Sequence, residues 1–464
     1  MWVKAVDMVL DRLRLTGIDF ANVRAISGSG QQHGSVYWKK GAAKVLQSLN
    51  PAEFLHKQLD GCFALRESPV WMDSSTAEEC LLLEQAVGGR KELAEITGSK
   101  AYERFTGSQI IKIKRRRSDV YENTERISLV SSFAASLLMG SYAPIDFSDG
   151  SGMNLLNIRT HEWDERCLNL CDTDLRDKLG DPVASGSPLG CISRYFVDRY
   201  GFPDDCAIAA FTGDNPASLI GMCLQDGDIA VSLGTSDTVF LWLDDPKPDV
   251  TGHILCNPLA EDSFMALLCY KNGSITRERM ARESAEGDWD IFSELLDSTP
   301  RGNFGNIGFY FDLQEIHPLV AGDFRFNKFD EKITRFSKEV EVRACVEGQF
   351  MRLRAHAQDL GYNATPNTRI LATGGASANR SILQVLADVF NAQVYVQEKP
   401  NSAAVGGAFL ARFSDKTSAI NVQELMSKAG SYTLAASPAK DAATIYAPMI
   451  ERYRNLERVI QQPS

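Results

Sequence analysis

The sequence has few of the residue patterns that hold metals or nucleic acids. Ten cysteines occur among 464 residues, but no two are spaced C-x-x-C, and the six histidines are scattered. This argues against a zinc site and favours free thiols in a reducing compartment. Acidic residues outnumber basic ones by 60 to 49, for a net charge of −11. Nucleic-acid-binding proteins need a basic surface, so that class is disfavoured. Because the overall charge is negative, a phosphate ligand would have to be bound by a few local groups, such as backbone N–H groups, a metal or a few basic residues.

The sequence also lacks long apolar segments. No apolar run reaches the roughly 18 residues that a membrane-spanning helix needs. The first residues, MWVKAVDMVLDRLRL, mix apolar residues with acids and bases, which fits neither a signal peptide nor a transit peptide. These absences predict a cytoplasmic protein without a membrane partner.

Strand-like and helix-like segments alternate in the second half of the chain. DIAVSLGTSDTVFLWL (228–243) predicts two strands around a Gly-Thr-Ser turn, residues 341–361 predict a long helix, and TRILATGG (368–375) predicts a strand ending in two glycines. Ser377 is placed to cap the next helix. A strand at AQVYV and a helix at NSAAVGGAFLARF follow. The alternation predicts an α/β domain with a largely parallel sheet, and the chain length suggests two or three domains.

The first half is less regular. A helical pattern at the start leads into a strand at 22–27, RISLVSSFAASLLM (126–139) reads as a buried helix, and DFSDGSG (146–152) reads as a loop. The basic run KIKRRR (112–117) fits either a localisation signal or a solvated helix face. The order helix, strand, glycine loop occurs twice, in residues 1–17 followed by VRAISGSG and in residues 341–361 followed by RILATGG. Two such short matches fit either a true internal repeat or chance similarity.

One carboxylate in the middle of the chain is a candidate for chemistry. AIAAF (207–211) reads as a strand, and Asp214 would lie just past its carboxyl end, where ligands bind in open α/β sheets. A carboxylate there could act as a general base toward a hydroxyl. Asp214 and Asn215 are also good turn and helix-cap residues, so both interpretations remain open.

Two glycine-containing turns in the second half suit a phosphate or a nucleotide. In SLGTSD, Gly234 lets the backbone approach closely, and Thr235 and Ser236 can donate hydrogen bonds. In ATGGASANRS, Gly374 and Gly375 precede a helix start, whose free N–H groups suit a nucleotide. Ordinary hairpin and strand-to-helix turns have the same composition, so this alternative stays open for both turns.

The stretch AISGSGQQHG (25–34) has three glycines after a strand, but it is not a dinucleotide fingerprint. Its spacing is GxGxxxG, and no strand with an acidic residue follows about 20 positions later. A nicotinamide dehydrogenase is therefore disfavoured. Gln32 and His33 instead offer donors and acceptors that can read sugar hydroxyls. With the phosphate-type turns in the other half, this indicates a two-lobed enzyme that moves phosphate from a nucleotide to a polyol.

Together these motifs resemble the FGGY carbohydrate kinases. The matching stretches follow the family's order along nearly the whole chain: GSGQQHGSVYW, PVWMDSST, TGSKAYERFTG, RISLVSSFAASLLMGSYAPIDFSDGSGMNLL, FTGDNPASL, GDIAVSLGTSD, EGQFMRLRAHAQDLGY, ILATGGASANRSILQVLADVF and NSAAVGGAF. The resemblance implies an α/β fold of two actin/hexokinase-like (ribonuclease H-like) lobes with a central cleft. The sugar-binding lobe would be residues 1–206 and the nucleotide-binding lobe 207–464. The implied reaction is ATP-dependent phosphorylation of a sugar, with xylulose as the expected substrate and Mg²⁺ as a cofactor.

The resemblance also implies roles for single residues. Asp214 would be the catalytic base, and the sugar would be bound by His33, Arg104, Asp214 and Asn215. The residues expected to bind ATP are Thr235, Trp289, Gly374, Gly375, Ala376 and Asn379. No side chain is implied as a metal ligand, and no oligomeric state is predicted.

One part of the family's pattern is missing. Family members start with a strand that carries an Asp-rich phosphate loop, followed by two further strands, whereas this sequence starts at the first helix. The first lobe would then lack its opening strands and an acid that helps to position Mg-ATP. A catalytically impaired or non-catalytic sugar- and nucleotide-binding protein of the same fold is therefore the alternative, and the presence of Asp214 argues against it.

Overall fold

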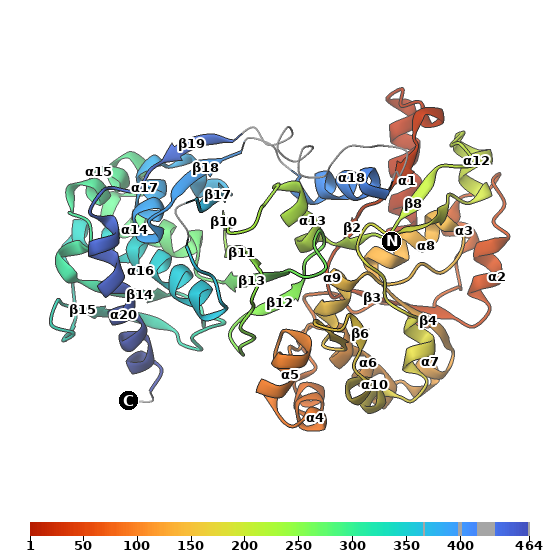
Figure 1. Ribbon diagram of the computed structural model, residues 1–464, viewed down its shortest axis with the longest axis horizontal. Helices are drawn as coiled ribbons and strands as arrows, with labels where there is room; N and C mark the ends of the chain where they lie inside the picture. Colours follow the sequence, from red (N-terminus) through yellow and green to blue (C-terminus); the bar gives the residue numbers. More distant parts are fainter. Residues whose placement is uncertain (365–366, 398–400, 415–431, 463–464) are drawn as a thin grey trace. The chain divides into compact units, whose positions relative to one another are not determined.

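The computed structural model describes residues 1–364, 367–397, 401–414 and 432–462 (Figure 1). The chain divides into two compact units. Of the described residues, the first unit contains 1–223, 248–264 and 401–414, and the second contains 224–247, 265–364, 367–397 and 432–462. Among the helices described, none combines the length and the apolar character needed to cross a bilayer.

The first unit is built from short strands surrounded by helices. Its strands are β1 (Ala25–Ile26), β2 (Ser29–Gly30), β3 (Ser35–Lys39), β4 (Thr124–Leu129), β5 (Leu156–Asn157), β6 (Glu162–Trp163), β7 (Pro188–Cys191), β8 (Ala207–Ala209), β9 (Thr212–Gly213) and β12 (His253–Cys256). Its helices are α1 (Trp2–Leu15), α2 (Ala42–Gln47), α3 (Leu55–Gln58), α4 (Ala77–Val87), α5 (Arg90–Thr97), α6 (Thr106–Arg116), α7 (Ser118–Glu122), α8 (Val130–Met139), α9 (Phe147–Gly150), α10 (Glu165–Cys171), α11 (Leu175–Leu179), α12 (Arg194–Tyr200), α13 (Asp214–Gly221) and α18 (Ser402–Ser414).

Two segments of the first unit that are far apart in the sequence run side by side. β1 pairs in parallel with β8, and β2 pairs in parallel with β9, with Gly30 opposite Gly213. Because the carboxyl ends of parallel strands meet at one edge, residues 31–33 come to lie beside Asp214. Gly30 is needed for close packing: a Cβ there would lie 2.4 Å from the backbone nitrogen of Ser131. This glycine of AISGSGQQHG therefore makes room for α8.

Helix α13, which begins with Asp214, packs tightly on α18. A Cβ on Gly221 would lie 1.8 Å from the carbonyl oxygen of Ser402, and one on Gly406 would lie 1.9 Å from that of Ala217. The glycines of NSAAVGGAF thus allow the two helices to approach closely. Because of this packing and the β2–β9 pairing, residues 207–223 belong to the first unit, and the expected boundary after residue 206 falls inside that unit.

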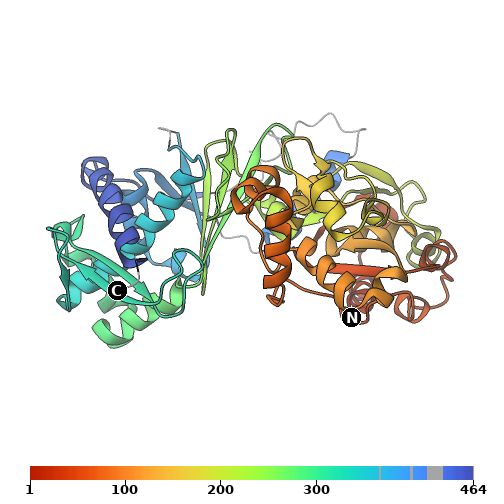
Figure 2. The ribbon, with the colours of Figure 1, turned by 90° about the horizontal axis from the view of Figure 1, so that it is seen from below.

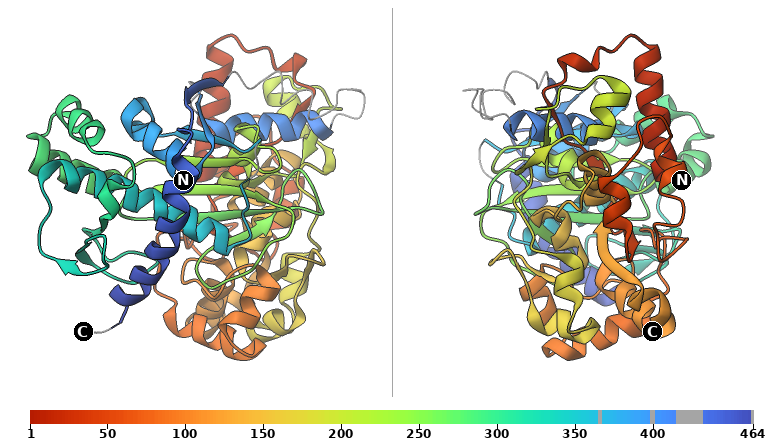
Figure 3. Two further views of the ribbon diagram at one scale, coloured as in Figure 1. Left: turned by 60° about the vertical axis from the view of Figure 1, so that its left-hand side comes forward. Right: turned by 90° about the vertical axis from the view of Figure 1, so that its right-hand side faces the viewer.

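The N-terminal helix α1 has the amphipathic character that its sequence predicts. Val3 and Asp7 are its buried residues, and the helix lies against α3 (Figure 3, red). The Asp7 carboxylate accepts hydrogen bonds from the backbone N–H groups of Leu55 (3.2 Å) and His56 (3.1 Å) at the start of α3. A buried acid thus satisfies free N–H groups of a short neighbouring helix.

The second unit contains a twisted sheet covered by helices. Its strands are β10 (Ile229–Leu233), β11 (Asp237–Leu243), β13 (Phe264–Tyr270), β14 (Ile307–Phe311), β15 (Gly322–Phe326), β16 (Lys332–Ile333), β17 (Arg369–Thr373), β18 (Gln393–Val396) and β19 (Thr433–Ala436). Its helices are α14 (Ser274–Ala285), α15 (Trp289–Ser298), α16 (Lys338–Asp359), α17 (Arg380–Phe390) and α20 (Ala442–Ile460). The main sheet has the order β13-β11-β10-β17-β18-β19, in which β10, β17 and β18 are parallel. Figure 2 shows α16, α17 and α20, in cyan to dark blue, on one side of these strands.

Most elements predicted in the second half are confirmed. The antiparallel pair β10–β11, the long helix α16, the strands β17 and β18, and the helices α17 and α18 all lie where the sequence predicts them. The predicted cap is wrong. Asn379 is the N-cap of α17, and its side chain accepts a hydrogen bond from the backbone of Ile382 (3.0 Å), whereas Ser377 lies in the preceding 3₁₀ turn, Gly375–Ala378.

Two interpretations of the first half are corrected. Residues 126–139 are not one helix: the chain forms β4 up to Leu129, which pairs with β3, and only then α8. DFSDGSG is not a plain loop, because Asp146 caps α9 and a 3₁₀ turn, Ser151–Met153, follows it. KIKRRR lies on α6, where Lys112 pairs with Asp73 and Lys114 with Asp172, in keeping with a solvated helix face.

Candidate functional site

Asp214 lies at the edge where β2 and β9 end. Its Oδ1 atom accepts hydrogen bonds from the backbone N–H groups of Gln32 (3.2 Å) and Asn215 (3.0 Å). Asn215 Nδ2 in turn donates to Gln32 Oε1 at 2.7 Å. Burial raises the pKa of Asp214, and the two backbone donors offset this only in part. The site thus holds a half-buried carboxylate in a fixed orientation, with an elevated pKa that suits a general base.

His33 follows Gln32 directly and is fixed by its own contacts. Its backbone has a φ of 68°, and its ring stacks on Phe105 with centroids 4.4 Å apart. Nδ1 donates to the carbonyl of Gly152 at 3.0 Å. Burial first, and then the charge of Arg104, lower the pKa of His33 to about 4, although the bond to Gly152 acts against them. The ring is therefore neutral at neutral pH, and its Nε2 is a hydrogen-bond acceptor.

Arg104 lies near this histidine and is held by an aromatic residue. Its Nη1 donates to the carbonyl of Trp71 at 3.3 Å, and its guanidinium lies 5.7 Å from the centre of the Trp71 ring. Trp71 itself is 46% exposed. The first unit therefore brings together the four residues expected to bind the sugar: His33, Arg104, Asp214 and Asn215.

Two buried acids, Asp146 and Asp149, lie near Asp214. The sequence predicts only a loop for the segment that contains them. Asp146 is 0% and Asp149 1% exposed. Burial raises the pKa of Asp146 to about 6, and burial together with the charge of Asp146 raises that of Asp149 well above the usual range. The sequence feature that could have indicated a buried acid pair is the i, i+3 spacing of Asp146 and Asp149 after the long apolar segment 126–139.

The two glycine turns of the second unit lie next to each other. β10 and β17 are neighbouring parallel strands, so the turn after Leu233 and the loop after Thr373 share one edge. Gly374 has a φ of +84°, and a Cβ there would lie 2.5 Å from the carbonyl oxygen of Leu233. Only glycine allows the loop to pass this close to β10. Thr235 is exposed in the turn between β10 and β11.

A cavity of about 560 Å³ lies beside the glycine loop. It is lined by four of the six residues expected to bind ATP: Trp289, Gly375, Ala376 and Asn379. Asn379 Nδ2 donates to Ser293 Oγ at 2.9 Å, which ties the loop to α15, and Trp289 is 40% exposed at the start of that helix. The volume of the cavity is in the range of small-molecule sites. Thr235 and Gly374 are not among the lining residues.

A buried ion pair supports the exposed turn. Arg277 on α14 makes two hydrogen bonds of 2.8 Å to the carboxylate of Asp237, the first residue of β11. Both side chains have an exposed fraction of 0%. Arg277 Nη1 also donates to Gln349 Oε1 on α16 at 2.7 Å. Both Asp237 oxygens are thus committed to Arg277, and the carboxylate fixes the end of the turn that contains Thr235.

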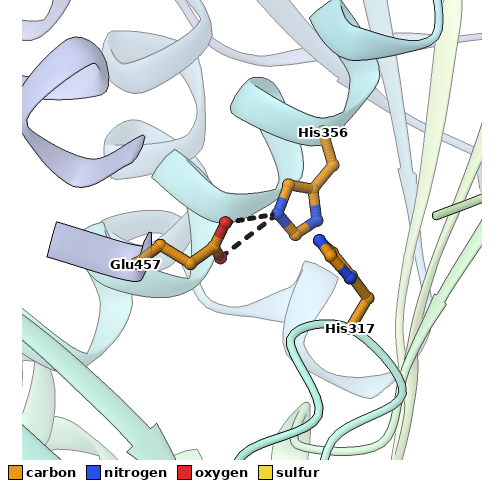
Figure 4. A group of neighbouring side chains, drawn as sticks. All are labelled: His317, His356 and Glu457. Atoms are coloured by element: carbon orange, nitrogen blue, oxygen red, sulfur yellow. Dashed lines mark hydrogen bonds and ion pairs between the residues drawn. The ribbon is translucent and has the colours of Figure 1, made fainter. Parts of the chain in front are cut away.

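The cluster of His317, His356 and Glu457, of which His317 is only partly buried, has the residue types of a metal site (Figure 4). His356 Nε2 lies 3.0 Å from a Glu457 oxygen, and its Nδ1 lies 3.1 Å from the Tyr270 hydroxyl. Both ring nitrogens of His356 therefore have protein partners. Burial acts to raise the pKa of Glu457, but His356, His317 and Arg352 hold it below its usual value. A metal ion would have to break the bond between His356 and Glu457, and it would lie near the positive charge of Arg352. The geometry therefore favours a structural role, in which His356 and Glu457 link α16 to α20.

Comparison with known proteins identifies the family. Residues 62–221 match the N-terminal domain and residues 229–414 the C-terminal domain of the FGGY family of carbohydrate kinases. The chain belongs to the FGGY family of carbohydrate kinases. It is 55% identical over 462 residues to the xylulose kinase of Rattus norvegicus, covering 99% of this chain and 86% of that protein. It is 47% identical over 424 residues to xylulose kinase 2 of Arabidopsis thaliana, covering 89% and 76%.

Solved structures confirm the expected two-lobed α/β fold. A xylulose kinase from Rhodospirillum rubrum matches with a TM-score of 0.82 at 16% identity, covering 99% of this chain and 89% of that chain. A second, described as a xyloylose kinase from Brucella ovis, matches with a TM-score of 0.81 at 18% identity and the same coverage. The fold therefore agrees with the family match and with the 55% identity to the rat protein, which show that the chain is a carbohydrate kinase.

Proposed function

We propose that this FGGY kinase phosphorylates D-xylulose to D-xylulose 5-phosphate at the expense of ATP. The observation that carries the proposal is the edge of β2 and β9, where Gln32, the neighbour of His33 in the sequence, is hydrogen-bonded to both Asp214 and Asn215. The sugar identity is supported by the 55% identity to rat xylulose kinase over nearly the whole chain. Nothing in the described residues or in these relatives favours the impaired alternative.

The sugar would bind to the first unit. The neutral Nε2 of His33 would accept a hydrogen bond from one sugar hydroxyl, while Arg104 and Asn215 would donate to sugar oxygens. Gln32 and Asn215 both donate to Oδ1 of Asp214, so neither occupies Oδ2. Asp214 would accept the proton of the attacking sugar hydroxyl as its oxygen bonds to the γ-phosphorus of ATP and ADP leaves.

The nucleotide would bind to the second unit. The adenosine would occupy the cavity lined by Trp289, Gly375, Ala376 and Asn379. Its phosphates would extend along Gly374 to Thr235, whose turn shares that edge of the sheet. The turn between β10 and β11 offers Mg²⁺ no free carboxylate, because both oxygens of Asp237 at its end bind Arg277. We therefore assign no Mg²⁺ ligand, and Mg²⁺ enters only as the counter-ion of ATP.

The proposed function is tested by coupled ADP release with a panel of sugars. We expect ADP release to depend on xylulose, with one sugar phosphate formed per ADP, and to be much slower with ribulose or glycerol. Xylulose binding without turnover, measured by calorimetry, would instead support the non-catalytic alternative. Faster turnover of another sugar would contradict the assigned substrate.

His33→Asn should weaken xylulose binding by about two- to tenfold, because one buried hydrogen bond contributes roughly 0.5–1.5 kcal/mol. ATP binding should not change, because His33 lies in the first unit and the nucleotide is assigned to the second. Isothermal titration with each ligand measures both. His161→Asn is the matched control, since His161 also has a left-handed φ of 59° and stacks on a phenylalanine, Phe147, at 4.6 Å. Equal losses for xylulose and ATP would contradict the division of the ligands between the units.

A further inference from the structure

Gln32 connects the proposed catalytic base to the protein interior. Its exposed fraction is 3%, its backbone N–H donates to Asp214 Oδ1 (3.2 Å), and its side-chain Oε1 accepts from Asn215 (2.7 Å). One residue therefore holds both Asp214 and Asn215. Whatever fixes the Gln32 amide also fixes the orientation of the sugar site.

The other end of the Gln32 amide faces Asp149. Gln32 Nε2 and Asp149 Oδ1 are both buried, and neither has a hydrogen-bond partner among the described residues. Both lie against Gly213: a Cβ there would be 3.0 Å from Gln32 Cδ and 2.7 Å from Asp149 Oδ1. The Gln32 side chain is also among the groups that lower the pKa of Asp149. An N–H donor and an oxygen acceptor thus face each other in a space that only glycine leaves open.

The surroundings of Asp149 disfavour its charged form. The hydrogen bond from Ser131 on α8 to Oδ2 (2.5 Å) acts against this by lowering the pKa of Asp149, and the backbone N–H of Asp149 donates to Asp146 Oδ1 at 3.2 Å. Burial raises the pKa of Asp149 most, followed by the charge of Asp146, with Asp214 adding to both. No basic side chain is among the leading influences on it. The Cys256 thiol on β12, which also lies in this region, has a pKa raised to about 12 by burial and stays neutral.

We propose that Asp149 is a positioning residue for the sugar site: as a neutral carboxylic acid it accepts a hydrogen bond from the Gln32 amide and thereby fixes Asp214 and Asn215. In the neutral acid the proton would sit on Oδ2, which would donate it to the Ser131 hydroxyl oxygen 2.5 Å away, and Oδ1 would remain an acceptor for Gln32 Nε2. A neutral acid at this position orients the site without placing a second negative charge beside the base. This inference rests on the proposed function of Asp214.

The test compares Asp149→Asn with Asp149→Leu. Asparagine keeps the oxygen that faces Gln32 and can donate to Ser131, so kcat/KM for xylulose should stay within about threefold of wild type. Leucine cannot accept the hydrogen bond and should lower kcat/KM by at least about tenfold, with KM for ATP unchanged. If the leucine variant does not fold, Gln32→Met takes its place, because it removes the amide at similar volume. Wild-type kinetics in Asp149→Leu or Gln32→Met, or equal losses in Asp149→Asn and Asp149→Leu, would overturn the proposal.

Two readouts separate positioning from mere stability. The acid limb of the kcat/KM profile should be unchanged in Asp149→Asn, and a limb moved to lower pH would show that Asp149 is charged in the wild type. The infrared difference spectrum between wild type and Asp149→Asn should contain the carbonyl stretch of a protonated carboxyl at neutral pH, and its absence would overturn the neutral acid. The infrared result does not depend on turnover. If wild type fails to phosphorylate xylulose, the proposed function fails separately, and the infrared spectrum still decides the state of Asp149.

Discussion

Asp214→Asn should lower kcat for xylulose-dependent ADP release by about 10²–10⁴-fold, the usual contribution of a general base. Asparagine has the same shape and still accepts the backbone hydrogen bonds of Gln32 and Asn215 at Oδ1. It cannot take up the proton of the attacking hydroxyl. Binding of xylulose should therefore change much less than turnover. Single-turnover ADP release, with xylulose titrated separately, makes the distinction.

The pKa of Asp214 gives this prediction a second, independent part. Because burial raises that pKa, the base is protonated at a higher pH than an ordinary aspartate, and kcat/KM should fall as the pH drops through this raised value. The same shift means that the folded protein disfavours the ionised form, so Asp214→Asn should have a melting temperature no lower than wild type. Asp198→Asn, at a surface pair with Arg194, is the control for loss of an aspartate. Near-normal turnover in Asp214→Asn would exclude Asp214 as the base.

The position of Asp214 could be predicted because its signal is local. An apolar strand followed by TGDN places a carboxylate at a strand end, and the structure has β8, β9 and α13 in that order. The state of His33 could not be predicted in this way. Its neutral ring depends on Phe105, Gly152 and Arg104, which the fold brings to it from distant parts of the sequence.

The sequence did not indicate Asp149, because its local composition favours a solvated loop whereas the folded chain buries this side chain. Asp, Ser and Gly favour turns, so DFSDGSG reads as a solvated loop, yet β9 and β12 pack against it and its acids are buried. Residues 126–139 show a related difficulty, since a short apolar run fits a strand or a helix equally well, and only the pairing of β4 with β3 decides. The placement of residues 207–223 likewise depends on α18, far along the chain, so no local pattern could reveal it.

Arg277→Met should destabilise the second unit by about 3–5 kcal/mol, because it leaves the Asp237 carboxylate buried without its partner. This is a large part of the roughly 5–15 kcal/mol that stabilises a typical domain. Asp237 begins β11 directly after the turn that contains Thr235, so ATP binding should weaken as well. Hydrogen exchange should show faster opening of β10, β11 and α14, with little change in peptides of the first unit.

Two further variants test the cause of this destabilisation. Arg282→Met removes an exposed arginine from the same helix, α14, and should change stability by no more than about 0.5 kcal/mol. Adding Asp237→Asn to Arg277→Met removes the stranded charge, so the double variant should regain much of the lost stability, as expected when both members of a buried pair are neutralised. If the double variant is no more stable than Arg277→Met, the loss comes from packing around the guanidinium stem. In that case the ion pair does not hold the turn that contains Thr235 in place.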